Sequence, residues 1–507
     1  MVQLSQFEQN QRSYSNQLRD LKYIIKRVNW TLWAAVVALV SCSTAVLAIY
    51  LHGPSLDEFA TEIYANQSIP LGKAWSGFWP QETNPPFFYI IARFSAESLG
   101  DSIFARRLIN LAPLLAMILW FSRTARIRTE LRGFLAAYAL LAFGGKFFLQ
   151  MLPFYRSYFW QYAAEVIFLG TMAIGLIDRR KSVDWVQLTC VPFLLMLHQV
   201  TAIYAATLLA FQFFIDLSLR AWVRAAILVA VTCVSIVPLM LFTYMQMRQA
   251  ADVVSLVGWI EKKNTMGAIA DMLAWLPITL AQNWMAVIAA GAALVMGRNT
   301  GLKSRRPVAV ISLAALLSTS VVLIINVYQP IVVQRYYTFL TVEIMCMLAL
   351  LVAPFMDRRS LSAAAIVLNS AIFLGTYGVG QVHKKLWEGG AEIVGKIVQS
   401  CPSTRVHGGV QPEDERVTLG LRYLGMKHGF AVMPVVADTP KECPVLYWSP
   451  GNVPTKSDLD TFNGDLARAI NSSARFNLPE TLLEKARGIL TGGGVIIVVE
   501  GTANTRK

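Results

Sequence analysis

Long stretches of this sequence contain no charged residue, and that absence sets its class. Charged side chains make up 15% of the 507 residues, apolar side chains make up 55%, and the mean hydropathy is +0.48. Soluble domains rarely reach such values. Uncharged apolar runs of about 20 residues cross a bilayer as helices. The sequence therefore predicts a polytopic α-helical membrane protein.

Histidine and cysteine are also scarce. The five His are scattered, and no group of Cys and His has the spacing of metal ligands, so no metal site is predicted. Two of the six Cys, Cys401 and Cys443, lie near the C-terminus, each directly before a Pro. The others lie in apolar runs, where a thiol packs as a small apolar group: Cys42, Cys190, Cys233 and Cys346.

Positive charge exceeds negative charge by 14, yet its distribution argues against nucleic-acid binding. Lys and Arg fall in short clusters between apolar runs, as in the cytoplasmic loops of membrane proteins. Residues 1–30 are polar and basic, so we expect a cytoplasmic N-terminal segment and no cleavable signal peptide. The first span then emerges on the far side, and residues 52–102 form the first extracytoplasmic loop.

One apolar run in this loop, Phe87–Leu99, is too short to span a bilayer. Its apolar residues recur at helical spacing: Phe87, Ile90, Ile91 and Phe94. We predict an amphipathic helix on the membrane surface that begins after Pro85-Pro86 and ends at Gly100. A short, tilted span is the alternative.

The position of this helix decides the sidedness of everything that follows. With Phe87–Leu99 at the surface, all the later basic clusters face the cytoplasm; if it spanned, they would all face outward. The positive-inside rule therefore favours about eleven transmembrane helices within a domain of residues 31–380. We place the spans at about residues 31–51, 103–121, 134–149, 159–177, 185–197, 202–217, 225–245, 276–296, 308–327, 337–355 and 361–379.

Residues 381–507 contain no predicted span, and we predict a small extracytoplasmic α/β domain. Its predicted helices are residues 384–399, 416–427 and 481–490, and its strands are residues 431–437, 444–448 and 495–499. In an oxidising compartment Cys401 and Cys443 can form a disulfide; two free buried thiols are the alternative.

Two adjacent carboxylates, Asp57 and Glu58, follow the first span. Carboxylates beside a bilayer are costly to desolvate, so they point to a function. On a helix they are about 100° apart, so only one faces a common site, while Glu58 and Glu62 share the other face. Polar residues also gather at the outer ends of later spans: Lys146, Arg156, Tyr158, Gln161, His198, Gln199, Gln334, Arg335, Tyr336 and Tyr337.

Cations and hydroxyls from several loops, with one acid for proton transfer, suit an anionic ligand at the outer interface. Arg and Tyr also occur at membrane interfaces as snorkelling and belt residues, which is the alternative for most of them. Asp57 is the residue that this alternative explains least.

The arrangement resembles the GT-C class of glycosyltransferases, which use polyprenyl-phosphate sugars. The resemblance rests on Leu56-Asp57-Glu58, on residues 84–89 (NPPFFY) and on residues 99–108 (LGDSIFARRL). These segments are similar to the bacterial branch that includes lipid A aminoarabinose transferases and protein O-mannosyltransferases. Arg156-Ser157-Tyr158, His198 and Arg335-Tyr336 look like later motifs of the class. Asn84 stands where relatives often have His or Lys, and Glu82 stands one position earlier than their usual acid.

The resemblance implies that an acceptor hydroxyl attacks the anomeric carbon of the lipid-linked sugar, with inversion and with Asp57 as general base. The expected acceptor is a cell-envelope glycolipid or polysaccharide, such as lipopolysaccharide core or lipid A, on the periplasmic side of a bacterial inner membrane. A divalent metal is not required, although the oligosaccharyltransferase branch uses one. The expected substrate-binding residues are Glu58, Glu82, Asn84, Lys146, Arg156, Tyr158, His198, Arg335 and Tyr336.

Besides a non-catalytic protein of sugar-polymer assembly on the same fold, two alternatives stay open. A transporter or flippase for a lipid-linked sugar fits Glu165 and Glu343, two acids within predicted spans. Against it, the sequence has no internal repeat and no matching pair of broken spans. A protein O-glycosyltransferase is the other alternative, because the sequence holds no acceptor signature.

Overall fold

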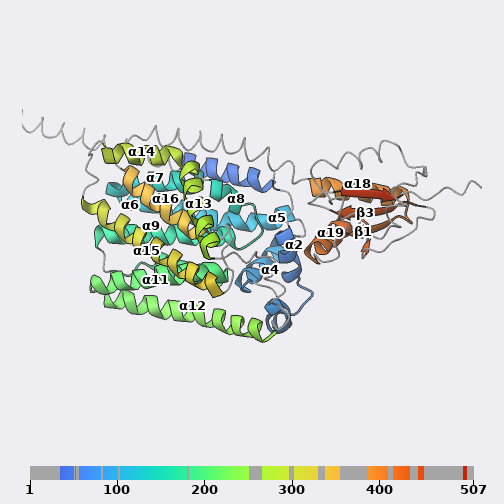
Figure 1. The fold of residues 1–507 in the computed structure, drawn as a ribbon, viewed down its shortest axis with the longest axis horizontal. Helices are drawn as coiled ribbons and strands as arrows, with labels where there is room; N and C mark the ends of the chain where they lie inside the picture. The colour runs from blue at the N-terminus through green and yellow to red at the C-terminus, as the bar shows by residue number, and fades with distance from the viewer. Residues whose placement is uncertain are drawn as a thin grey trace, which may run out of the picture.

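The structure, a computed structural model, consists of a helical bundle with a smaller layer of strands and helices at one end (Figure 1). It describes residues 35–50, 52, 56–81, 84–100, 103–144, 146–179, 182–249, 265–295, 302–328, 337–353, 386–408, 415–433, 443–449 and 495–499.

Five described helices are long and apolar enough to cross a membrane. The first, Ile103–Ile127, joins α5 (Ile103–Arg107), η3 (Leu108–Asn110) and α6 (Leu111–Ile127). The other four lie in α9 (Tyr158–Asp178), α11 (Gln199–Ser218), α12 (Trp222–Gln249) and α15 (Leu302–Tyr328). Three shorter apolar helices are Ala35–Tyr50, α10 (Trp185–Met196) and α16 (Thr338–Val352). All eight coincide with predicted spans, whereas the last predicted span, residues 361–379, lies outside the described residues.

The predicted span at residues 134–149 corresponds to α7 (Arg132–Gly144) and α8 (Lys146–Met151), and residue 145 between them lies outside the described residues. One predicted span is divided, so the prediction of one continuous helix was wrong there. Residues 276–296 fall into α13 (Thr265–Gln282), which begins inside the predicted loop, and α14 (Trp284–Val295). The break lies at Asn283, whose side-chain amide donates to the Thr279 carbonyl at 2.8 Å. Such a side chain competes with the helix's own backbone hydrogen bonds.

The bundle is organised around α9. Of its apolar window, 83% is buried, against 22% for α12. It packs against α6, α8, α10, α15 and α16, so it is apolar on all sides. By contrast, α12 exposes large side chains along its length, among them Val234 and Met240. An exposed apolar face of this kind suits contact with lipid hydrocarbon.

Helix α4 (Phe87–Leu99) has the predicted bounds. Pro86 precedes it, and Gly100 ends it with a φ of 82°, a left-handed value that favours glycine. It buries Phe88 and Tyr89 against the protein. Its apolar residues Ile90 and Phe94 are exposed, Phe94 by 62%.

The smaller layer contains a four-stranded sheet of order β2-β1-β3-β4. Its strands are β1 (Arg405–Gly408), β2 (Val432–Met433), β3 (Val445–Ser449) and β4 (Val495–Val499). β1 is parallel to β2 and β3, and β4 is antiparallel to β3. The helices are α18 (Leu386–Ser400) and α19 (Glu415–His428). β1 was not predicted, because its four residues lack a run of β-branched or aromatic side chains. The predicted helix at residues 481–490 lies outside the described residues.

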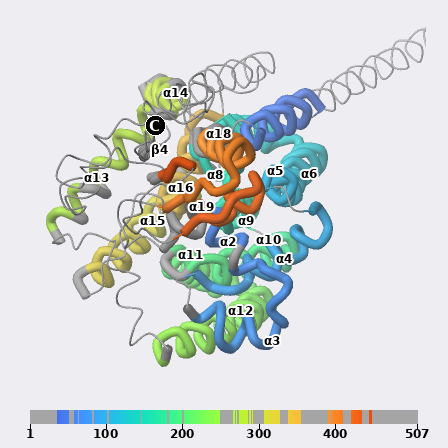
Figure 2. Tube along the Cα trace, turned by 90° about the vertical axis from the view of Figure 1, so that its right-hand side faces the viewer, coloured from blue at the N-terminus to red at the C-terminus, as the bar shows by residue number. Residues whose placement is uncertain are grey.

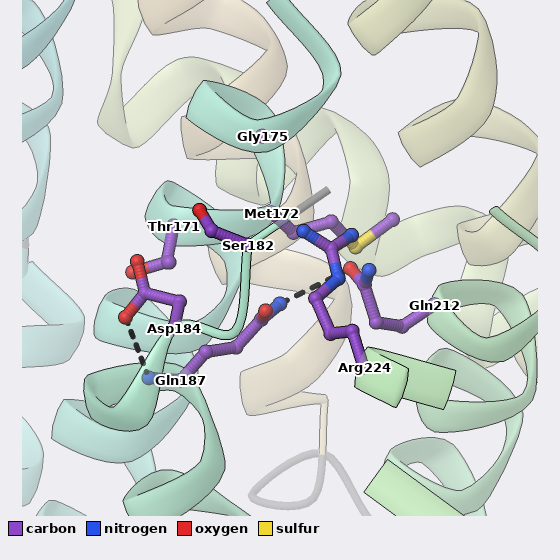
Figure 3. A pocket seen from close by; sticks show the side chains of 8 residues that line it. All are labelled: Thr171, Met172, Gly175, Ser182, Asp184, Gln187, Gln212 and Arg224. Carbon is purple, nitrogen blue, oxygen red and sulfur yellow. Dashed lines mark hydrogen bonds between the residues drawn. The ribbon is translucent and has the colours of Figure 1, made fainter. Parts of the chain in front are cut away.

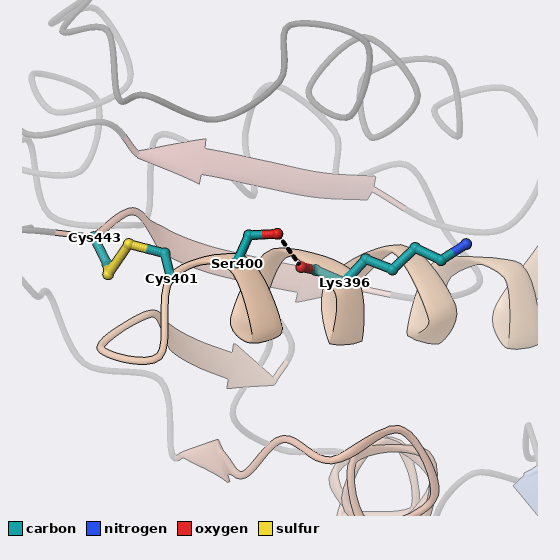
Figure 4. Close-up of a disulfide and its surroundings, with 4 residues drawn as sticks. All are labelled: Lys396, Ser400, Cys401 and Cys443. Atoms are coloured by element: carbon teal, nitrogen blue, oxygen red, sulfur yellow. Dashed lines mark hydrogen bonds between the residues drawn. A yellow bond between two sulfur atoms is a disulfide. The ribbon is translucent and has the colours of Figure 1, made fainter.

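A disulfide joins Cys401, directly after α18, to Cys443, two residues before β3 (Figure 4). The two Cα atoms are 5.8 Å apart, within the range that a disulfide spans. The bond fastens the end of α18 to the start of β3.

We predict that replacing both Cys401 and Cys443 by Ser destabilises this layer. The bridged positions are 42 residues apart, and closing such a loop stabilises a fold by about 3–4 kcal/mol. Protease resistance of residues 386–499 during heating measures the loss. Cys233→Ser, at a free and exposed cysteine of α12, is the control. Equal resistance in oxidised and reduced wild-type protein would contradict the prediction.

The charge distribution predicts that Arg126 and Glu97, both exposed, lie on opposite sides of the membrane. Single cysteines at these positions, in a background without the four free cysteines, can be labelled in intact cells with an impermeant maleimide. We expect labelling at position 97 and none at position 126 until the membrane is opened. Labelling at position 126 in intact cells would overturn the assigned sidedness.

Candidate active site

Helix α2 (Leu56–Tyr64) carries both adjacent acids, Asp57 and Glu58. It lies beside α4 and α5, between the bundle and the smaller layer (Figure 1). The view along the long axis shows α2, α4 and α5 at the end of the bundle that the smaller layer covers (Figure 2). The surroundings of α2 therefore define the candidate site.

The carboxylate of Glu58 is held by the guanidinium of Arg107. Arg107 Nε donates to Glu58 Oε1 at 2.7 Å, and Arg107 Nη2 donates to Oε2 at 2.7 Å. Both side chains are buried, and Glu58 has no exposed area. Two parallel charge-assisted bonds fix direction as well as distance. Glu58 therefore locks α2 onto the start of the span Ile103–Ile127.

The Glu58–Arg107 pair also forms hydrogen bonds with two more segments of the chain. The Tyr155 backbone N–H donates to Glu58 Oε1 at 2.8 Å. Arg107 Nη1 donates to the carbonyls of His52 at 2.6 Å and Ile49 at 3.3 Å, at the end of the first apolar helix. One buried ion pair thus joins four stretches that are far apart in the sequence.

Two opposing effects set the pKa of Glu58. Burial alone would raise it, but the charge and hydrogen bonds of Arg107 outweigh burial and hold the pKa below its ordinary value. His52, whose Nε2 lies 4.0 Å from Glu58 Oε2, and the Tyr155 amide act in the same direction. Glu58 is therefore an anion at neutral pH.

One turn further along α2, Glu62 forms an ion pair with Arg106, and Arg106 Nε donates to the Gly100 carbonyl at 2.8 Å. Arg106 therefore pairs with Glu62, while the adjacent Arg107 pairs with Glu58. The two acids are four residues apart and share a face of α2, as predicted. On the helix, the Asp57 position is rotated about 100° from Glu58, away from these pairs.

This geometry revises the expected role of Glu58. Both of its oxygens already accept hydrogen bonds within the protein, and no surface of the side chain is exposed. Direct contact with substrate would require breaking the pair with Arg107. Glu58 therefore positions α2, and a role of its side chain in substrate binding stays a prediction.

Phe59 connects α2 to the smaller layer. Its buried side chain belongs to the core formed by α18, α19 and the sheet, together with Ala391, Leu421 and Leu446. Its ring lies 5.2 Å from that of Tyr423, measured between centroids. Two contacts therefore hold α2 in place. Arginines of the bundle pair with its acids, and the smaller layer packs against Phe59.

The loop between α8 and α9 borders α2 and α4. The Asn110 amide donates to the carbonyls of Leu152 and Phe154 at 2.8 and 2.7 Å. The Tyr155 hydroxyl donates to the Ala92 carbonyl at 2.7 Å and lies 2.6 Å from Ser95 Oγ. Burial raises the pKa of Tyr155 to about 12, so its phenol stays protonated as a donor.

Three of the predicted site residues lie around this loop. Arg156 is buried and donates from Nη1 to the Tyr89 hydroxyl at 3.4 Å. The rings of Tyr158 and His198 have centroids 6.1 Å apart. The loop and the segment before α11 also share a small core with α4, through Tyr155, Leu197 and Phe88. The structure therefore brings the α2 region, Arg156 and His198 to one end of the bundle.

Other predicted site residues are not fully described. Glu82, Arg335 and Tyr336 lie outside the described residues. Asn84, half-buried, stands three residues before α4. Lys146 is the first residue of α8, next to the loop. Within the described ranges, no three His, Cys, Asp or Glu side chains gather as a metal site would require.

Sequence reasoning missed Arg107, Asn110 and Tyr155. A signal was available for the arginine: Arg106 and Arg107 stand at the predicted outer end of a span, where the positive-inside rule disfavours cations. Their presence there indicates partners of opposite charge, and the preceding loop holds several acids, among them Glu58 and Glu62. No comparable signal marks Asn110, whose partners are backbone carbonyls.

A small polar pocket lies at the opposite ends of the same helices (Figure 3). Gln187 donates to Gln212 at 3.1 Å, and Arg224 Nε donates to Asp216 at 2.8 Å. The pocket is therefore separate from the candidate site, and its charges are paired within the protein. Its lining consists of Thr171, Met172, Gly175, Ser182, Asp184, Gln187, Gln212 and Arg224.

The bundle of membrane helices, with α2 and α4 at the end that a smaller layer covers, has the fold of a solved membrane protein. Among solved structures, the chain is similar to the crystal structure of ArnT from Cupriavidus metallidurans bound to undecaprenyl phosphate. The TM-score is 0.54, with 93% of this chain and 98% of that chain covered, at 12% identity. No family description and no curated protein matches the sequence. At this identity the likeness concerns the fold.

We predict that Glu58 and Arg107 are energetically coupled. Glu58→Gln leaves a buried guanidinium without its counter-charge, and Arg107→Gln leaves a buried carboxylate, each costing about 3–5 kcal/mol. The double variant should lose less than the sum of the two, as measured by thermal unfolding in lipid nanodiscs. Glu392→Gln, which breaks an exposed pair with Lys396, is the matched control. Additive losses would refute the coupling.

The pair also predicts a pH response. Because the pKa of Glu58 is lowered in the folded protein, its stabilisation is complete at neutral pH. It is lost as the pH falls below the ordinary range of a glutamate, about 4.3. Wild-type protein should therefore lose more stability than Glu58→Gln when the pH is lowered through this range.

Proposed function

We propose that this protein is a GT-C glycosyltransferase that moves a sugar from a polyprenyl-phosphate donor to a cell-envelope acceptor. One observation carries the proposal: the Glu58–Arg107 pair fixes the helix bearing Asp57 beside the loop that bears Arg156. The shared fold with a protein bound to undecaprenyl phosphate supports a donor of the same kind. The residues around Asp57, Pro85-Pro86 and Arg106-Arg107 support it from the sequence.

In the proposed reaction, Asp57 accepts the proton of the acceptor hydroxyl as that oxygen attacks the anomeric carbon. The bond from this carbon to the lipid phosphate breaks, and one displacement inverts the anomeric centre. An ordinary Asp has a pKa of about 3.9 and is a weak base at neutral pH. Its contribution therefore comes mainly from position, which is what the anchoring of α2 supplies.

The leaving group is a lipid phosphate that gains negative charge as the bond breaks. Arg156 is the described cation that we assign to it, because a guanidinium can donate two parallel hydrogen bonds to phosphate. Its contact with Tyr89 orients the side chain beside α4. Lys146 and Arg335 are the further proposed cations. The prenyl chain would lie along the lipid-facing helices, which explains why a transferase of this kind is a membrane protein.

We place the site on the periplasmic side of a bacterial inner membrane. The basic clusters support this placement, and so does the disulfide, since such bonds persist in oxidising compartments. The proposed acceptor is lipopolysaccharide core or lipid A. A flippase for the lipid-linked sugar is the second candidate, because Glu165 and Glu343 are buried within the bundle.

The decisive test compares wild-type protein with Asp57→Asn in nanodiscs that contain a radiolabelled polyprenyl-phosphate sugar and envelope acceptors. We expect transfer by the wild type and a rate about 10²–10⁴-fold lower for the variant. Glu97→Gln, at an exposed acid of α4, is the matched control with unchanged transfer. Thermal unfolding should show Asp57→Asn as stable as the wild type.

The outcomes separate the candidates. Equal transfer by wild type and Asp57→Asn would sink the assignment of Asp57. Movement of the labelled lipid across liposome membranes without transfer would replace the enzyme by the flippase. Transfer to a peptide hydroxyl, and to no lipid or polysaccharide, would make the protein an O-glycosyltransferase of proteins.

A further inference from the structure

The side chain of Asn110 lies inside the bundle, at the end of the short turn η3. It has no exposed area, and both ends of its amide are hydrogen-bonded. The nitrogen donates to the carbonyls of Leu152 and Phe154, and the oxygen accepts from the Trp160 indole at 3.1 Å. A buried amide with its donors and its acceptor satisfied keeps one orientation. Asn110 is therefore a rigid attachment point for the loop between α8 and α9.

One peptide group of this loop is held at both of its polar ends. The Phe154 carbonyl accepts from Asn110 at 2.7 Å. The N–H of the same peptide group belongs to Tyr155 and donates to Glu58 Oε1 at 2.8 Å. A peptide group is planar, so hydrogen bonds at its two ends fix how it is turned about the chain. This fixed peptide group comes directly before Arg156.

The backbone of Arg156 is bonded to the same carbonyl. Its N–H donates to the Phe154 oxygen at 2.8 Å and closes a three-residue turn. The oxygen thus accepts from both Asn110 and Arg156, which uses both of its lone pairs. The direction in which the Arg156 side chain leaves the backbone therefore depends on where Asn110 holds this oxygen.

The turn that ends at Asn110 also follows Arg107, the partner of Glu58 on α2. Side chains three residues apart in a 3₁₀ turn lie on the same side, and Arg107 and Asn110 have this spacing across η3. One turn of the chain thus holds α2 through the arginine and the loop through the asparagine. The position of Asp57 relative to Arg156 therefore depends on both side chains.

We propose that Asn110 is a positioning residue of the transferase, which aims Arg156 at the phosphate of the lipid donor by holding the Phe154 carbonyl. The inference rests on the function proposed above, in which Arg156 stabilises the leaving phosphate. Asn110 itself does not touch the substrate, because its amide is buried and bonded within the protein. Without this amide, the carbonyl loses a donor, the peptide group is held at one end only, and the guanidinium moves away from the phosphate.

A cycle of transfer rates in lipid nanodiscs tests the proposal, with Asn110→Ala, Arg156→Gln and both substitutions together. Misplacing a catalytic group by about 1 Å can lower a rate by about 10²-fold, and we expect a loss of this size from Asn110→Ala. In the Arg156→Gln background the same substitution should change the rate by about twofold at most, because the group that it positions is already absent. A residue that only supports folding would lower the rate by the same factor in both backgrounds.

Binding of the donor lipid gives a second readout, which needs no turnover. The probe is radiolabelled undecaprenyl phosphate, which lacks the sugar. It should bind Asn110→Ala about tenfold more weakly than it binds the wild type, since one hydrogen bond to a charged group is lost. Arg156→Gln should weaken binding at least as much, and the two substitutions together should weaken it no further.

Two more variants separate positioning from folding. Trp160→Phe removes the N–H that orients the Asn110 oxygen but keeps a ring against Phe193. It should therefore show part of the loss of transfer, even if Asn110→Ala does not fold. Asn283→Ala is the matched control, because it removes another buried amide that donates to a carbonyl, in the break between α13 and α14. It should leave transfer unchanged, and thermal unfolding identifies the variants that are folded.

The outcomes distinguish this inference from the proposed function. Equal rate factors in the two backgrounds would overturn the positioning role, and so would unchanged lipid binding by folded Asn110→Ala, while the wild type still transfers sugar. If Asn110→Ala does not fold, unchanged transfer by Trp160→Phe overturns the role instead. A wild type that neither transfers sugar nor binds undecaprenyl phosphate would overturn the proposed function, and this inference with it.

Discussion

The arrangement of the candidate site depends on one buried ion pair. Glu58 and Arg107 are 49 residues apart in the chain, yet their contact fixes α2 against a membrane helix, the end of the first apolar helix and the Tyr155 loop. A buried pair is not favourable by itself, because both charges lose water. The pair instead fixes direction, because two parallel hydrogen bonds permit few orientations of α2. The position of Asp57 relative to Arg156 follows from that restriction.

Much of the outer framework could be predicted from local sequence. Pro85-Pro86 and Gly100 set the bounds of α4 correctly, because proline and glycine act through the backbone at their own positions. Uncharged apolar runs located eight helices for the same local reason. The division of the helix at Asn283 was not predicted, because the apolar run continues through that residue; its side-chain amide donates to the Thr279 carbonyl.

The candidate site was less predictable, because its contacts are long-range. That the positions of residues 57 and 58 lie on different sides of the helix could be inferred from helical rotation alone. Which residue meets Glu58 could not, since the pairing depends on how α5 packs against α2. Tyr155 contacts α2 through its backbone amide and α4 through its hydroxyl. Because almost every residue has a backbone amide, the residue type does not predict the first of these contacts. Strand β1 could not be predicted for the same reason, because it forms by pairing with a strand on each side.

The packing of Phe59 implies an order in which parts of the fold can form during synthesis. Its side chain enters a core built from α18, α19 and the sheet, which are all translated after α2. Since early segments take up structure before later ones exist, α2 can form its arginine contacts during synthesis while Phe59 still lacks its neighbours. The core around Phe59 is therefore completed only after α18, α19 and the sheet have been translated, and until then one side of α2 lacks its packing partners.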